Sequence, residues 1–279
     1  EAGQSAFGDV LAWFRDIIAW PLENLKSLNL SQAEIDELKN EIMLKLSHKA
    51  ESIPASESAP VALDWVNGRR TPDANQNLKA AIVNMNLGTK APQIFRALVE
   101  AICFGSKRIV DRFREEGVEI DTIVGIGGVA KKSGFIMQSL ANVLNMPIMV
   151  AVSEQAPALG AAMYAAVAAN IHPNMQKAIL AMGNGFEQTY KPQPDQVAIY
   201  EKLYEKYVLL GDFVENVCQR TSNFLNVLRS QKWRGPDNTS FKSFNNNKTI
   251  LGHNRLSILD KKPRSNQPMV SSDGRFILI

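Results

Sequence analysis

Cysteine and histidine are scarce in this chain. Its 279 residues contain 2 cysteines and 3 histidines. That is too few for a disulfide framework, so we expect a reducing, cytoplasmic environment. The spacing of these residues fits no metal site, and we assign none. No secretory signal opens the chain. The longest apolar run, Ala156–Ala169, is shorter than the roughly 18 residues of a membrane span. We therefore expect no membrane partner and a tightly packed core helix at that run.

Glutamate is absent after Glu215. Residues 1–221 carry 21 Lys and Arg against 25 Asp and Glu, whereas residues 222–279 carry 10 against 3, a net charge of +7. The isoelectric point of about 8.8 is therefore a property of the tail. It gives no reason to propose nucleic acid as a partner of the main body. The change in composition suggests two segments of different origin.

Helical and strand-like patterns alternate along the first segment. Apolar residues recur at helical spacing in residues 8–20 and 94–113, and Ser31-Gln-Ala-Glu34 is a capping box. Residues 62–68 resemble a hairpin that turns at Asn67-Gly68. Further on we expect strands at 121–126 and 147–152, with helices at about 133–145, from about 156, and at 195–214. This order predicts an α/β fold. In the tail, residues 250–259 and 275–279 look like strands, residues 245–248 like a turn, and residues 263–268 like a loop.

A glycine turn after the first of these strands is the main candidate for chemistry. The segment reads Asp121-Thr-Ile-Val-Gly-Ile-Gly-Gly-Val-Ala-Lys-Lys-Ser133. A strand that leads through a glycine turn into a helix exposes backbone N–H groups at a helix N-terminus, which suits phosphate. Three interpretations stay open: a packing turn without a ligand, a dinucleotide site with Glu154 as its acid, and the phosphate turn of a kinase.

Four motifs in order resemble one family. They are Glu1-Ala-Gly-Gln-Ser-Ala-Phe-Gly-Asp9, Ala62-Leu-Asp-Trp-Val-Asn-Gly-Arg-Arg-Thr-Pro-Asp73, Gly127-Gly-Val-Ala-Lys-Lys-Ser133 with Met137-Gln138, and Glu154–Ala162. Over about residues 1–214 the chain resembles the C-terminal domain of FGGY carbohydrate kinases, most closely the L-ribulokinases of arabinose catabolism. The resemblance implies an actin-like (ribonuclease H-like) ATPase fold, with ATP and Mg²⁺ as the nucleotide and its metal.

The resemblance also assigns nucleotide-binding residues. It implies that Gly127 and Gly128 lie against the nucleotide, that Lys132 and Ser133 lie near the adenine and ribose, and that Gly8 lies close to the phosphates. An amide side chain that contacts the nucleotide in related kinases is replaced here by Ala12. Lys131 and Lys132 also fit a solvated helix start.

The resemblance places no catalytic residue in this chain. In the family, the general-base Asp and the first phosphate loop belong to an N-terminal domain, which also binds most of the sugar. Asp9, Asp64 and Asp73 match none of these groups, so we expect them to cap helices or lie at the surface. We therefore expect this chain alone to be inactive, and its sequence does not determine the sugar.

The tail resembles a second family. Arg234-Gly-Pro-Asp-Asn238, Leu251–Asp260, Asn266–Met269 and Asp273–Phe276 resemble class II glutamine amidotransferases of the asparagine synthetase type. The resemblance implies that Arg255 is a vestigial glutamine-binding residue. It also implies an N-terminal nucleophilic Cys, which the internal Cys218 does not replace. We therefore expect a kinase domain at 1–214, a junction at 215–221 and an incomplete amidotransferase-like segment at 222–279. The alternative is an inactive or interaction-only chimeric fragment.

Overall fold

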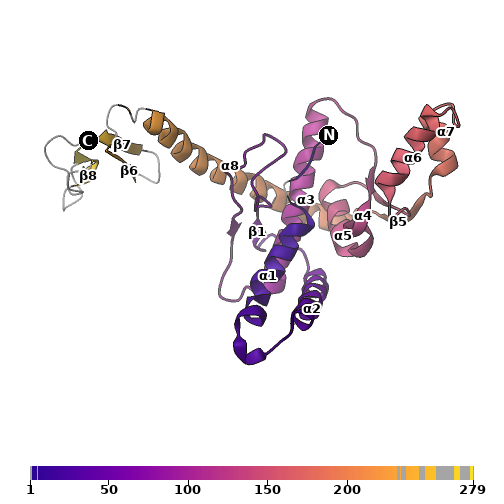
Figure 1. The fold of residues 1–279 in the computed structure, drawn as a ribbon, viewed down its shortest axis with the longest axis horizontal. Coiled ribbons are helices and arrows are strands. Elements are labelled where there is room, and N and C mark those ends of the chain that lie inside the picture. Colours follow the sequence, from indigo (N-terminus) through magenta and orange to yellow (C-terminus); the bar gives the residue numbers. More distant parts are fainter. Residues whose placement is uncertain are drawn as a thin grey trace. The chain divides into compact units, whose positions relative to one another are not determined.

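The structure is a computed structural model that describes residues 2–4, 6–230, 233, 237–244, 249–255, 267–270 and 277–278. The chain forms two compact units, Glu1–Leu210 and Gly211–Ile279 (Figure 1). Helix α8 (Pro194–Ser230) contributes residues to both units.

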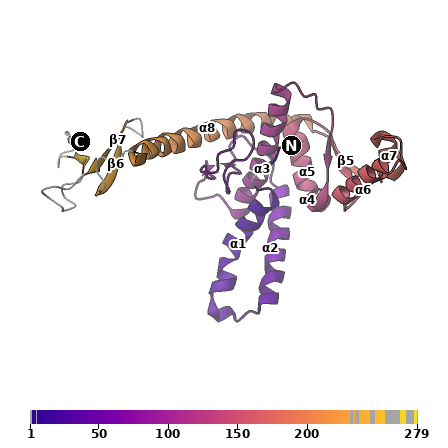
Figure 2. The ribbon, with the colours of Figure 1, turned by 45° about the horizontal axis from the view of Figure 1, so that its top comes forward.

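Three long helices build much of the first unit. Helices α1 (Gly8–Asn24) and α2 (Gln32–Glu51) lie side by side, joined through the short 3₁₀ turn η1 (Lys26–Leu28) (Figure 2). The predicted capping box starts α2, because Glu34 N–H donates to Ser31 Oγ at 3.4 Å while the Glu34 carboxylate accepts from Ser31 N–H at 2.8 Å. Helix α3 (Ala91–Glu115) packs against both and carries the most buried part of the core. All three predicted helices are confirmed.

A three-stranded sheet carries the glycine turn. Strands β3 (Ile123–Gly125) and β4 (Ile148–Ala151) pair in parallel, with Ile123 opposite Ile148. Helices α4 (Gly127–Lys132) and α5 (Gly134–Leu144) form the crossover that parallel pairing requires. Strand β5 (Phe186–Tyr190), which the sequence did not predict, adds antiparallel to β4. The α/β class is confirmed.

The small-residue run is a helix, but it is not a core helix. It forms α6 (Ala156–Ala168), which packs against α7 (Met175–Met182). Only Met163 and Ala166 of α6 are buried, and Tyr164 is 69% exposed. The prediction of a tightly packed core helix is therefore wrong, because alanine-rich composition indicates helix formation but does not say which face another element covers.

The strand at the start of the predicted hairpin, residues 62–68, pairs with a more distant segment of the chain. Strand β1 (Val61–Ala62) pairs antiparallel with β2 (Ile82–Val83), about twenty residues on. The turn at Gly68 is present, with φ of +81° and its N–H bonded to Trp65 O at 3.1 Å. It leads into a loop rather than into a returning strand, so the hairpin prediction is wrong.

The second unit contains two-stranded sheets. Strand β6 (Asn238–Phe244), which was not predicted, pairs antiparallel with β7 (Thr249–Arg255), and β8 (Met269–Val270) pairs with β9 (Ile277–Leu278). Strand β9 falls within the predicted run 275–279, and β7 overlaps the predicted run 250–259 but begins one residue before it. The predicted turn at 245–248 and part of the predicted loop at 263–268 lie outside the described residues. Helix α8 runs on past the predicted end at 214, through residues 215–221.

Candidate nucleotide site

The predicted glycine turn joins β3 to α4. Ile126 is the N-cap of α4, with extended backbone and no side-chain capping bond. Gly127 follows with φ of +81°, a conformation that favours glycine. A Cβ added at Gly127 or at Gly128 would meet no atom within 4 Å. The backbone of this turn is therefore open to the approach of a ligand.

Gly125, the first glycine of the motif, has a different role. A Cβ at Gly125 would lie 3.1 Å from Ala130 Cβ and 3.3 Å from Met137 Sδ. A side chain at Gly125 would crowd both neighbours, so glycine favours the close approach of β3 to α4 and α5. The interpretation of the turn as packing alone fits Gly125, whereas it leaves the open space around Gly127 and Gly128 unexplained.

A second helix N-terminus lies beside this turn. Gly8 is the first residue of α1, and its N-cap Phe7 makes no side-chain capping bond. A Cβ added at Gly8 would lie 3.6 Å from Val129 Cγ2, within the first turn of α4. The first turns of α1 and α4 are therefore neighbours. The N–H groups at the two N-terminal ends have no side-chain cap, and uncapped helix N-termini in general favour anions.

The two lysines and the serine after the turn have separate environments. Ser133 Oγ accepts a hydrogen bond from Ile136 N–H at 3.3 Å and caps α5. Lys131 Nζ donates to Val152 O at 2.6 Å and lies 3.5 Å from the Glu187 carboxylate, so it is not the solvated residue that the sequence allowed. Lys132 is exposed. Ser133 thus has a structural role that does not depend on a ligand.

The dinucleotide interpretation loses support. Its glycine fingerprint belongs to an open, mostly parallel sheet. Here the sheet that holds the turn has the order β3-β4-β5, and β5 is antiparallel. Glu154, the candidate ribose ligand, is exposed in the loop after β4.

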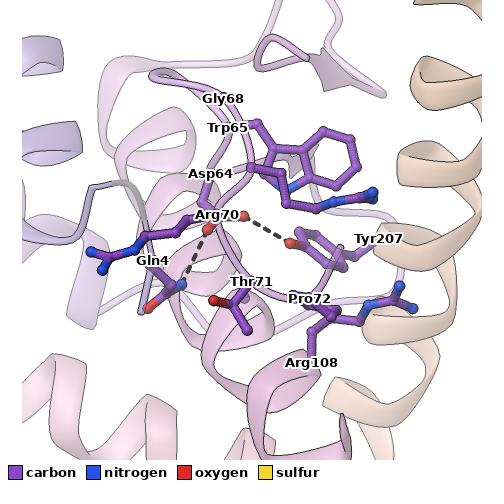
Figure 3. A pocket seen from close by; sticks show the side chains of 11 residues that line it. Gln4, Asp64, Trp65, Gly68, Arg70, Thr71, Pro72, Arg108 and Tyr207 are labelled. Carbon is purple, nitrogen blue, oxygen red and sulfur yellow. Dashed lines mark hydrogen bonds between the residues drawn. The ribbon is translucent and has the colours of Figure 1, made fainter. Parts of the chain in front are cut away.

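The expectation that Asp64 caps a helix or lies at the surface is wrong. Asp64 is buried, with 6% of its surface exposed. Tyr207 Oη donates to its Oδ1 at 2.7 Å and Gln4 Nε2 donates to its Oδ2 at 3.1 Å (Figure 3). Burial raises the pKa of the Asp64 carboxyl, and the bonds from Tyr207 and Gln4 oppose that shift. The signal for burial was available, because Asp64 follows the apolar run Val61-Ala-Leu63. As expected, Asp9 is exposed in the first turn of α1 and Asp73 is exposed in the loop.

A buried ion pair in α3 was also missed. Arg96 Nε donates to Glu100 Oε1 at 2.8 Å, and both side chains are less than one-tenth exposed. Arg96 also donates to Tyr200 Oη at 2.8 Å and to Ala50 O at 3.1 Å, which links α3 to α8 and α2. Burial raises the pKa of Glu100 to about 7, and the Arg96 charge opposes this shift. The spacing of four residues between Arg96 and Glu100, on an amphipathic helix, was the signal in the sequence.

Four cavities lie away from the glycine turn. Arg96 lines two of them, of about 310 and 350 Å³. A third, of about 370 Å³, lies beside Lys90 and Pro92. The fourth, of about 10 Å³, adjoins Asp64 and Tyr207 and is the size of one water molecule (Figure 3). None of the four is lined by the glycines of the candidate nucleotide site.

The described residues contain no group of three or more His, Cys, Asp or Glu side chains that could hold a metal ion. Among them, no helix is both long and apolar enough to span a membrane. Arg255 is the last residue of β7 and pairs in register with Asn238. Its side chain, like that of Cys218 in α8, lies outside what the structure describes.

Comparison with known proteins agrees with this fold. Residues 1–169 match the FGGY family of carbohydrate kinases, C-terminal domain, and residues 209–279 match a glutamine amidotransferase domain. The chain is 44% identical over 220 residues to a ribulokinase of Vibrio parahaemolyticus, covering 78% of this chain and 39% of that protein. It thus spans about two fifths of the length of that relative.

Solved structures of sugar and glycerol kinases share the fold of this chain. A xylulose kinase from Rhodospirillum rubrum superposes with a TM-score of 0.63 at 19% identity, covering 77% of this chain and 40% of that one. A glycerol kinase from Plasmodium falciparum, determined with ADP, superposes with a TM-score of 0.51 at 21% identity, covering 70% of this chain and 36% of that one. The fold is therefore the actin-like fold of sugar kinases. The chain belongs to the FGGY family of carbohydrate kinases.

Proposed function

We propose that residues 1–214 are the nucleotide-binding half of an ATP-dependent kinase that phosphorylates ribulose. The observation that carries this proposal is the contact between the first turns of α1 and α4, at Gly8 and Val129, beside the uncovered backbone of Gly127 and Gly128. Such a place suits the phosphates of a nucleotide. Identity to ribulokinases supports the choice of sugar, and the ADP in the Plasmodium falciparum glycerol kinase structure supports the choice of nucleotide.

Each predicted residue has a role in this proposal. The Gly8 turn faces the phosphates, Gly127 and Gly128 lie against the nucleotide, and Lys132 and Ser133 border the adenine and ribose. Mg²⁺ would arrive with ATP, held by phosphate oxygens and water, as is common for this ion. These roles come from the family resemblance and agree with the open surface at the turn.

The reaction needs groups beyond this half. A sugar hydroxyl oxygen attacks the γ-phosphorus in line, the bond from that phosphorus to the bridging oxygen breaks, and ADP leaves. The hydroxyl proton passes to an Asp general base, which in this family belongs to the N-terminal domain. We propose that the sugar, too, binds mainly to that domain. We further propose a cytoplasmic location, and a tail at 222–279 that is a vestigial amidotransferase-like segment joined through 215–221.

Calorimetric titration with ATP and with NAD tests the nucleotide assignment. The 279-residue chain should bind ATP more tightly than NAD, and Gly128→Val should weaken ATP binding because its side chain would block the approach to the backbone. Equal ATP binding by the wild type and Gly128→Val would contradict the assignment. Tighter binding of NAD would favour an oxidoreductase.

A matched pair of glycines separates ligand contact from backbone strain. Gly127 and Gly117 have φ values of +81° and +80°, and a Cβ at either would meet no atom within 4 Å. Alanine at either position should therefore cost a similar amount of stability, about 1 kcal/mol. Only Gly127→Ala should weaken ATP binding. An equal loss of binding in both variants would show that strain alone is responsible.

A further inference from the structure

We propose that Asp64, acting through Gln4, is a positioning residue that holds the Gly8 turn in place for the nucleotide phosphates. This inference rests on the proposed function. It joins the motif at residues 62–73, to which the proposed nucleotide site gives no role, to the motif at residues 1–9, which contains Gly8. The contact between them is shown in Figure 3.

Gln4 is fixed on several sides. Its Nε2 donates to Asp64 Oδ2 at 3.1 Å and to Ile102 O at 2.8 Å, and its Oε1 accepts from Ser106 Oγ at 3.0 Å. The backbone beside it is also held, because Gly3 N–H donates to Thr71 Oγ1 at 3.3 Å. The chain from residue 4 to Gly8 is short, so these bonds limit where α1 can begin.

Asp64 is itself held from the other side. Tyr207 of α8 donates to its second carboxylate oxygen at 2.7 Å, and both residues are buried. The carboxylate therefore joins α8 to the segment that precedes α1. Because the first turn of α1 lies beside α4, a shift of this segment would change the gap between the two helix N-termini.

Helix α3 passes beside the contact between Gln4 and Asp64 at Gly105, which has no side chain. Gly105 lies within α3, where alanine is normally the more stable residue. A Cβ there would collide with Gln4 Nε2 and lie 2.5 Å from Asp64 Oδ2. Glycine at this position permits Gln4 and Asp64 to meet above the helix, and Gly105→Ala should force them apart.

Calorimetry with ADP and with adenosine tests the proposal, because only ADP carries phosphates. Gln4→Met removes the amide but keeps the side-chain length, and it should weaken ADP binding about tenfold, the effect of losing one strong hydrogen bond. Gly105→Ala should do the same. Adenosine affinity should change by less than about twofold. Amide hydrogen exchange at residues 6–10 should become faster in both variants, with or without nucleotide.

Two variants of Asp64 and one control variant define its role. Asp64→Leu, which cannot accept from Gln4, should lower the ratio of ADP to adenosine affinity as Gln4→Met does. The conservative Asp64→Asn should restore the wild-type ratio, because an amide can accept from Gln4 and donate to Tyr207 Oη. Tyr204→Phe removes another hydroxyl of α8, which bonds Asp111 at 2.9 Å and does not contact Gln4; it should leave the ratio unchanged.

The outcomes are distinguishable. Equal weakening of ADP and adenosine, or no change in Gln4→Met and Gly105→Ala, would overturn the positioning role and leave the proposed function standing. If the wild type bound neither ADP nor adenosine, both the positioning role and the proposed function would be overturned.

Discussion

The Tyr207 hydroxyl donates a 2.7 Å hydrogen bond to Asp64 Oδ1 across 143 residues of sequence. Both groups are buried. Burial raises the pKa of Tyr207, and the neighbouring Asp64 charge raises it further. Tyr207 therefore remains a neutral donor, and the bond helps to fix the first part of α8 against the loop at 64–73.

Tyr207→Phe should destabilise the first unit by about 1–3 kcal/mol, because a buried carboxylate loses a donor that the phenyl ring cannot replace. The matched variant Tyr204→Phe should cost less, since its partner Asp111 is only partly buried. Urea unfolding followed by circular dichroism would measure both. Equal losses of unfolding free energy in the two variants would contradict the larger effect expected at Asp64, the more buried of the two carboxylates.

Glu100 should make stability depend on pH. Its pKa is raised to about 7 from an ordinary value of 4.5, so the folded state holds a proton over an interval in which the unfolded state has lost it. The resulting stabilisation is complete below about pH 4.5 and is lost as the pH rises through about 7. The change should be on the order of 1–3 kcal/mol.

Glu100→Gln isolates this contribution, because it keeps the side-chain shape and removes the titration. The difference in unfolding free energy between the wild type and Glu100→Gln should fall steadily from about pH 5 to about pH 8. A difference that does not vary with pH would show that Glu100 is ionised throughout in its pair with Arg96.

The 279-residue chain alone should transfer no phosphate to ribulose. In the family the general base and the first phosphate loop lie in the N-terminal domain, and removal of a base typically lowers the rate by about 10² to 10⁴. A coupled assay for ADP release, with an intact sugar kinase as the positive control, would measure this. Turnover close to that of the intact enzyme would refute the prediction.

Residues 222–279 should neither hydrolyse glutamine nor form a stable domain. The described strands there form only two-stranded sheets, which are marginal in water. The segment's net charge of +7 adds repulsion. Limited proteolysis should trim the chain to near residue 215 and leave a resistant core. Survival of the tail would contradict this prediction, as would ammonia release from glutamine that a thiol reagent abolishes.

Local patterns in the sequence determined much of the fold. The capping box at Ser31 and Glu34 predicted the start of α2, and apolar periodicity predicted α1 and α3, because both signals act within a few residues. The glycine turn predicted a strand that leads into a helix, and β3 and α4 confirm that order. The roles of Gly127, Gly128, Lys132 and Ser133 remain predictions.

Only the tertiary structure decided which groups are buried and which meet. Asp64 looked like a surface residue because sequence pattern does not show that Gln4 and Tyr207 would reach it from distant segments. The alanine-rich α6 looked like a core helix, yet what covers a helix depends on its neighbours and not on its own composition. The free energies of burial and of long-range hydrogen bonding arise from contacts between segments far apart in the chain, and no local pattern encodes them.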